Sequence, residues 1–250
     1  MPGQMTEVRL GDCFIAEQAG ELVVASGGLE RRLRLRTQAR TIAIADRLTG
    51  LNYIRKPCQE FSLALAPGAE RVHSGHCDFW EVQLHREGDA LSAAVHLAGK
   101  PAGPGQGMRV TLTYTVWQAS PAVLKRVTLS SESGDLSQVQ SLAAEDLYLL
   151  APPGARLLAG ASLEPLPVPS CARGEAILVA TPFGEGQGLL FALKQGGAQT
   201  FVETVAGGER LRLGITAPGV AECTVLSAPL YGTPDKMREQ LKQGTVTYFP

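Results

Sequence analysis

The sequence predicts an all-β protein built from two large antiparallel sheets packed face to face. Short runs of alternating apolar and polar residues recur along most of the chain, glycines and prolines punctuate them, and helix signals are scarce. The 28 glycines and 16 prolines are spread over all 250 residues rather than gathered in one linker. We therefore expect a single sandwich domain over residues 1–250, with a change of sheet near residues 151–169.

Residues 107–150 provide the clearest evidence and predict a meander of long strands. In residues 109–116, valine, leucine and tyrosine alternate with arginine and threonine, which is typical of a half-buried strand. Further strands are expected at residues 124–130 and 139–150. The segment 137–149 also has some helical character, but its position in the meander favours a strand.

Shorter runs of the same kind predict strands along the rest of the chain. These are expected at residues 8–17, 22–25, 29–37, 41–46, 61–65, 79–86, 90–97, 176–181, 188–194, 200–205, 211–215 and 221–228.

One short helix is expected near the C-terminus. Thr233 can cap it, Pro234 suits the first helical position, and Asp235 lies favourably at the positive end of the helix dipole. Gly244 is expected to end it.

The charge balance argues against nucleic-acid and membrane partners. The formal net charge is −1, so the chain as a whole does not attract polyanions. No run approaches the roughly 18 apolar residues needed to span a bilayer. The arginines of residues 31–36 alternate with leucines, which predicts the solvent face of a strand.

Cysteine usage predicts an intracellular, reducing environment. The five cysteines are scattered and form no CxxC pair, which favours reduced and mostly buried thiols in a cytoplasmic protein. No apolar segment typical of a secretory signal is present near the N-terminus, and we expect no cofactor.

The order of several motifs resembles the N-terminal β-supersandwich domain of α-galactosidase-type glycoside hydrolases, which has the galactose-mutarotase-like fold. The similarity covers roughly residues 8 to 230. It is carried by GLERRL at 28–33, TIAIADRLTG at 41–50, EFSL at 60–63, DFWEV at 78–82, VTLTY at 110–114, PAVLKRVTL at 121–129 and AEDL at 144–147. The resemblance implies a supersandwich without the catalytic (β/α)₈ barrel of that family, so glycosidase activity is not expected of this chain.

The densest group of chemically active side chains is the segment His73-Ser-Gly-His-Cys-Asp78. Its spacing matches no established zinc motif, and no second His/Cys pair lies elsewhere to complete a tetrahedral site. We therefore expect a sugar-contacting loop or a polar strand entrance rather than a metal site.

Two tryptophans are candidate platforms for a sugar ring, which stacks on aromatic side chains. Trp80 is in phase with Val82 and Leu84, which predicts a core position. Trp117 follows the threonine face of its strand and is expected at the surface, either as a sugar platform or packed under a loop or at a subunit contact. The predicted contact surface therefore combines Trp117 with His73, His76 and Asp78.

Three hypotheses for function follow. The first is a non-catalytic module that recognises carbohydrate or assembles with a separate hydrolase subunit. The second, implied by the epimerase branch of the same fold, is a sugar-active epimerase or lyase with histidine and carboxylate groups as acid and base. Its candidate residues are His76, His85, His96, Asp78 and Glu81. The third is a structural protein that forms homo-oligomers through its sheet edges.

Overall fold

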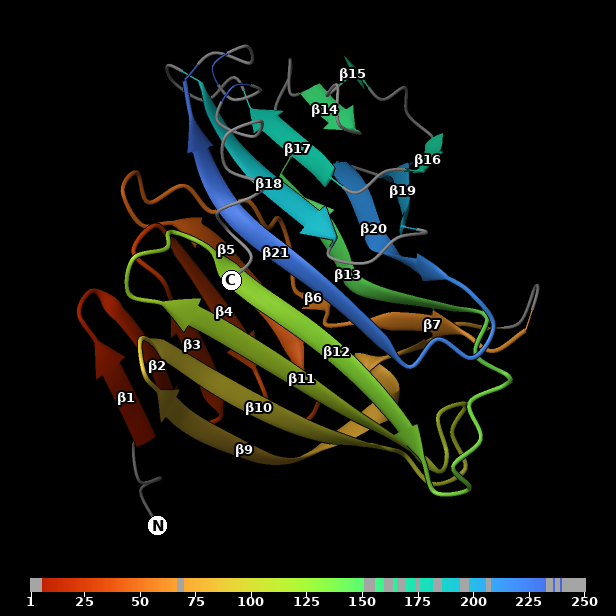
Figure 1. Cartoon of the computed structure of the whole chain (residues 1–250). Helices are drawn as coiled ribbons and strands as arrows, with labels where there is room; N and C mark the ends of the chain where they lie inside the picture. The colour runs from red at the N-terminus through yellow and green to blue at the C-terminus, as the bar shows by residue number, and fades with distance from the viewer. Residues whose placement is uncertain are drawn as a thin grey trace.

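Two β-sheets lie face to face in the computed structural model (Figure 1). The structure describes the backbone of residues 6–66, 70–150, 156–159, 164–165, 170–173, 176–181, 186–193, 198–205 and 208–232, with Lys236 and Glu239. Side chains are described for residues 6–66, 70–150, 186–193 and 210–232 and for those same two residues.

The first sheet contains twelve strands among the described residues. Ten follow the order β1-β2-β3-β4-β5-β6-β13-β20-β19-β16, while β7 pairs with β13 and β8 with β7. Their bounds are β1 Thr6–Leu10, β2 Cys13–Gln18, β3 Glu21–Ala25, β4 Leu29–Arg34, β5 Arg40–Asp46, β6 Cys58–Gln59, β7 Ser62–Ala64, β8 Val72–His73, β13 Ser141–Leu149, β16 Ser170–Arg173, β19 Ala198–Val205 and β20 Gly208–Thr216.

The second sheet contains nine strands within the same described ranges, in the order β15-β14-β17-β18-β21-β12-β11-β10-β9. Their bounds are β9 Cys77–Glu87, β10 Ala90–Gly99, β11 Met108–Trp117, β12 Val123–Ser131, β14 Arg156–Ala159, β15 Glu164–Pro165, β17 Ala176–Thr181, β18 Gln187–Leu193 and β21 Glu222–Tyr231. A short 3₁₀ turn, η1 at Ser74–His76, precedes β9.

The alternation seen in the sequence sets the two faces of the central strands. In β11, Val110, Leu112, Tyr114 and Val116 are buried against the first sheet, and the threonines between them face outward. The same alternation holds along β10, which pairs with β11 in antiparallel register from Ala90 to Ala98. Such a pattern leaves only one register that buries every apolar side chain.

The strand predicted at residues 8–17 is instead a hairpin. β1 and β2 are joined by Gly11 and Asp12, with Leu10 opposite Cys13. The next hairpin turns through Ala19 and Gly20, which both have positive φ (55° and 83°), as a two-residue type I′ turn requires. A short polar interruption was too weak a signal to separate β1 from β2.

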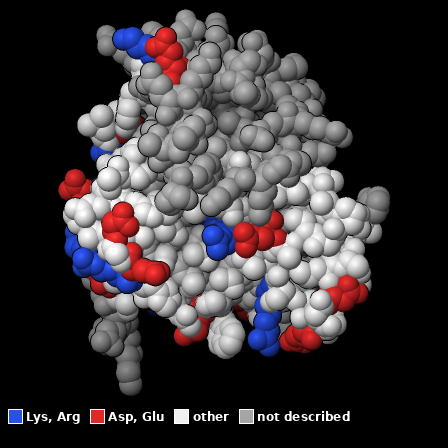
Figure 2. Space-filling model, viewed as in Figure 1, with Lys and Arg blue, Asp and Glu red and all other residues white. Residues whose placement is uncertain are grey.

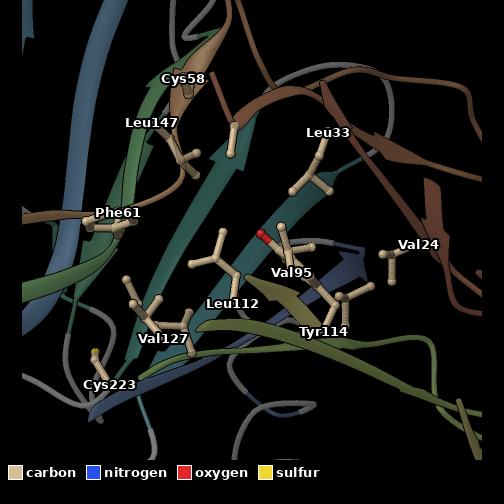
Figure 3. Close-up of a cluster of buried hydrophobic side chains, with 14 of the residues drawn as sticks. Val24, Leu33, Cys58, Phe61, Val95, Leu112, Tyr114, Val127, Leu147 and Cys223 are labelled. Carbon is tan, nitrogen blue, oxygen red and sulfur yellow. The ribbon is translucent and has the colours of Figure 1, made fainter. Parts of the chain in front are cut away.

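The space between the sheets is filled by one large hydrophobic core, to which both sheets contribute (Figure 3). Leu33 and Leu147 enter it from the first sheet, and Val95 and Leu112 from the second. Phe61, in the connection between β6 and β7, is fully buried in the same cluster. Burial of this much apolar surface is the main force that holds the sheets together.

The segment predicted as a strand at residues 139–150 contains β13, which runs from Ser141 to Leu149, so the alternative of a helix at 137–149 is not realised. β13 belongs to the first sheet and β14 to the second, so the chain changes sheet between them. The helix predicted after Thr233 falls mainly on residues outside the described part of the chain and stays a prediction.

Lysine and arginine side chains are interspersed with aspartate and glutamate on the face seen in Figure 2. In the described part of the chain, no helix is long and apolar enough to cross a membrane.

Candidate functional site

The histidine-rich segment forms a tightly held turn at one end of the sandwich. His73 precedes η1, and its Nδ1 atom accepts a hydrogen bond from the backbone N–H of Gly75 at 3.1 Å. The rings of His73 and His76 stack with centroids 3.8 Å apart. Lys100 Nζ donates to the carbonyl of Gly75 at 3.0 Å and therefore fixes the turn to the end of β10. Burial, and then the neighbouring His76, lowers the pKa of His73.

The described residues contain no group of three or more His, Cys, Asp or Glu side chains suited to a metal ion.

The same end of the sandwich exposes Trp80, contrary to the core position expected from the sequence. Trp80 is 68% exposed. His96 lies opposite Glu81 and Leu97 opposite Phe79, so Trp80 has no cross-strand partner and forms a β-bulge in β9. The bulge shifts the alternation by one residue, which breaks the phase that linked Trp80 to Val82.

Arg109 connects Trp80 to a residue that lines a nearby cleft. The Cζ atom of Arg109 is 6.0 Å from the centroid of the Trp80 ring, and Arg109 pairs with Glu132 at 3.8 Å. Glu132 belongs to the lining of a cleft of about 380 Å³, formed by the connections β10–β11 and β12–β13. The lining is mixed: apolar groups come from Leu65, Pro104, Met108, Leu136 and Val139, and polar groups from Gln106, Ser131, Glu132, Ser133, Asp135 and Gln138.

Trp117 lies at the other end of the same strands. Trp117 is paired with Ala90, whereas Asp78 is paired with Ala98, eight residues further along β10. At about 3.3 Å per residue, the two positions are roughly 26 Å apart. Trp117 is half-buried and packs against a small apolar cluster that includes Leu226 on the outer face of the second sheet. The structure therefore does not bring Trp117 together with the 73–78 segment.

The remaining candidate acid–base residues lie on the outer face of β9 and β10. His96 and Glu81 are directly opposite each other, and His96 Nδ1 lies 3.1 Å from Thr111 Oγ1. His85 is opposite Ser92, four residues along β10 from His96. Asp78, with a side chain 63% exposed, lies 3.9 Å from Lys100 Nζ.

A second polar cluster, which the sequence analysis missed, lies in the centre of the sandwich. It joins side chains from both sheets, and all its members are fully buried. These are Arg31, Thr41, Glu60, Tyr114, Lys125 and Glu145.

Arg31 is the centre of this cluster. Its Nη1 and Nη2 atoms donate to the two carboxylate oxygens of Glu145 at 2.6 and 2.9 Å, in a bidentate pair. Nη2 also donates to Thr41 Oγ1 at 2.7 Å, and it lies 3.2 Å from Glu60 Oε2. Lys125 Nζ lies 2.9 Å from Glu60 Oε2 and 3.4 Å from Glu145 Oε2, so it connects the two carboxylates.

The electrostatics of the cluster favour the ionised forms. Burial alone would raise the pKa of Glu60, but Lys125 and Arg31 outweigh it and lower the pKa from 4.5 to about 2. Burial would likewise lower the pKa of Arg31, which Glu145 and Glu60 instead hold well above its usual value. Burial raises the pKa of Tyr114 well above its ordinary value, and its hydroxyl donates to Glu60.

The expectation that arginines 31–36 face solvent is correct for three of them and wrong for Arg31. Arg32, Arg34 and Arg36 are exposed, but Arg31 shares the inward face with Leu29 and Leu33. Its phase with these leucines was the signal that could have identified it. The cluster contains two cations and two carboxylates, and it is closed to solvent, so it acts on the packing of the sheets rather than on a substrate.

The described strands form a large sandwich of two antiparallel sheets. No protein-family model and no curated protein matches the chain. The GH36 α-galactosidase AgaB from Geobacillus stearothermophilus is similar in structure, with a TM-score of 0.64 and 12% identity over 89% of this chain and 42% of that one.

Two further structures give the same result. An α-galactosidase from Lactobacillus brevis has a TM-score of 0.60 and 13% identity over 89% of this chain and 41% of that one. The α-N-acetylgalactosaminidase NagBb from Bifidobacterium bifidum has a TM-score of 0.63 and 13% identity over 88% and 38%. The chain therefore spans less than half the length of these proteins, and the predicted resemblance is confirmed at the level of the fold.

Proposed function

We propose that this chain is a non-catalytic carbohydrate-recognition module related to the sandwich region of GH36 glycoside hydrolases. The observation that carries the proposal is Trp80, an indole that a β-bulge holds at 68% exposure next to Arg109, which pairs with Glu132 in the lining of a cleft. An exposed aromatic ring with charged side chains nearby suits a pyranose, whose apolar face stacks on the ring while its hydroxyls form hydrogen bonds.

The geometry favours recognition over catalysis. Glu81 is exposed and His96 half-buried on an outer sheet face. Among the described residues, the carboxylates and cations that the fold encloses together are those of the interior cluster. That cluster is fully buried between the sheets, where a sugar cannot reach it.

The test is a titration of the whole chain with galactose, raffinose and stachyose, the last two being ligands named with similar structures. The chain has two tryptophans, so Trp117→Phe leaves Trp80 as the sole indole and as a fluorescence reporter. We expect a saccharide to shift the emission of this variant to shorter wavelength and to raise its melting temperature. Trp80→Ala should bind at least about tenfold more weakly, because stacking on an aromatic ring is lost.

Trp117→Phe also serves as the matched control, since it keeps the packing near Leu226 and should bind as the wild type does. Equal binding by Trp80→Ala and wild type would move the site away from Trp80. If no saccharide binds, the proposal fails, and the assembly hypothesis would be pursued by searching for a hydrolase subunit that copurifies with the chain.

A further inference from the structure

The outer face of the first sheet gathers basic side chains in one row across four neighbouring strands. Arg40 in β5 lies opposite Gln59 in β6, which lies opposite Asp146 in β13, which lies opposite Arg212 in β20. Two positions along β13, Tyr148 lies opposite Arg210 in the same strand β20. The antiparallel register therefore places three arginines on one sheet face around a single aspartate.

Asp146 is the centre of this arginine patch, and it is 1% exposed. Arg210 donates to its two oxygens through Nε at 2.7 Å and Nη2 at 3.0 Å. Arg212 Nε lies 3.4 Å from Asp146 Oδ2. The side chains of Arg210 and Arg212 remain 22% and 20% exposed, so they reach the surface.

Arg71 adds a further guanidinium to the patch. It donates to Ser62 Oγ at 3.3 Å and to Ser141 Oγ at 3.5 Å, which orients it over β7 and β13. Burial lowers its pKa first, the positive charges of Arg212 and Arg210 lower it further, and Asp146 opposes them. Arg71 is therefore held close to charges of its own sign.

Within the described part of this face, four guanidinium groups gather around one buried carboxylate. The carboxylate is that of Asp146, and the guanidinium groups belong to Arg40, Arg71, Arg210 and Arg212. Lys56 lies close by, with its Nζ atom 3.7 Å from the centroid of the Tyr148 ring.

One donor in the patch also lacks a partner. Arg40 Nε is buried and has no hydrogen-bond partner among the described residues, although Arg40 donates to Gln38 through another nitrogen. A buried donor without an acceptor is destabilising, and an anion bound at this face would remove that cost.

We propose that the arginine patch, formed by Arg40, Arg71, Arg210 and Arg212 around Asp146, binds an oxyanion, namely the carboxylate, sulfate or phosphate group of a small ligand. A planar guanidinium donates two parallel hydrogen bonds to such a group, and several guanidinium groups together neutralise its charge. A neutral sugar gains neither effect. The patch is on the first sheet and Trp80 on the second, so this site does not depend on the carbohydrate site proposed above.

The test compares galacturonate with galactose, which differ by a carboxylate, and adds inorganic sulfate and phosphate at constant low ionic strength. Affinity is measured by calorimetry on the whole chain, with melting temperature as the check on folding. We expect the anions to bind, galactose to bind this patch no better than background, and Arg71→Gln to weaken anion binding by about tenfold or more. Arg40→Gln is the second variant, in case Arg71→Gln fails to fold.

Arg126→Gln is the matched control, because it removes an equal charge from an exposed arginine on the second sheet, where Arg126 pairs with Glu222 at 3.7 Å. Equal losses in Arg71→Gln and Arg126→Gln would mean a general charge effect and would overturn the proposal, as would the absence of anion binding. Galacturonate binding far above sulfate identifies an acidic saccharide as the ligand, and equal binding identifies a free inorganic anion.

Discussion

The interior cluster and the arginine patch contain the same kinds of charged side chain but pair them differently. Inside the sandwich, Arg31 and Lys125 face Glu60 and Glu145, two cations with two carboxylates. On the outer face of the first sheet, several arginines surround Asp146. The interior cluster has one carboxylate for each cation, whereas in the arginine patch Arg210 and Arg212 share the single carboxylate of Asp146.

Burial explains the difference. An uncompensated charge inside a protein costs several kcal/mol, because water no longer solvates it. Where side chains reach the surface in part, solvent and salt screen like charges and a charged ligand can bind them. A closed cluster of paired charges therefore indicates a structural role, and a partly exposed group of like charges suits a binding role.

The largest expected effect comes from unbalancing the interior cluster. Arg31→Met leaves Glu145 without its bidentate partner and should lower the free energy of unfolding by about 3–5 kcal/mol. Denaturant unfolding measures it. Arg32→Met, one residue away but exposed, is the control and should change stability by less than about 0.5 kcal/mol. Equal effects of the two substitutions would contradict a special role for the interior charges.

Lowering the pH should destabilise the wild-type protein through the same interior cluster. Glu60 has a pKa of about 2 in the folded protein against an ordinary value of 4.5, so the unfolded chain takes up the proton first as the pH falls. The contribution of Glu60 to stability is therefore complete above about pH 4.5 and is lost between that pH and about 2. Between pH 4.5 and 2, the free energy of unfolding should fall more steeply with decreasing pH for the wild type than for Glu60→Gln. Equal slopes for the two proteins would contradict the lowered pKa of Glu60.

A smaller effect is expected at the surface. Asp146→Asn removes the only fully buried carboxylate described in the arginine patch and should lower the free energy of unfolding by about 1–3 kcal/mol. Added sulfate should restore part of the loss, because it replaces the missing negative charge. Thermal unfolding with and without sulfate measures both effects. If sulfate leaves this loss unchanged, the negative charge of Asp146 is not the source of its contribution to stability.

The sequence predicted the sandwich well because alternation reports directly which side of a strand is buried. Leu112 and Tyr114 follow that rule, and the strand β13 was recognised despite its helical composition. The interior cluster was missed because a charged residue was assumed to mark the solvent face. Arg31 and Lys125 both occupy the apolar phase of their strands, and that mismatch is the signal for a buried ion pair.

The arginine patch could not be predicted from local patterns. Arg40, Arg71 and Arg212 come from distant parts of the chain, and only the order of the strands brings them together. Trp80 was misplaced for a simpler reason. In the sequence Trp80 has the same alternation phase as Val82, which predicted that both are buried. A bulge changes this phase within the strand, and bulges leave little trace in sequence.

The bulge also makes Trp80 separable from the core in evolution. Because Phe79 and Glu81 already pair with Leu97 and His96, loss of the single codon for Trp80 would leave every other residue of β9 in its present register. A lineage could therefore gain or lose the indole in one step without repacking the interior. If the proposed carbohydrate site is correct, a one-residue gap at this position would mark homologues that no longer use it.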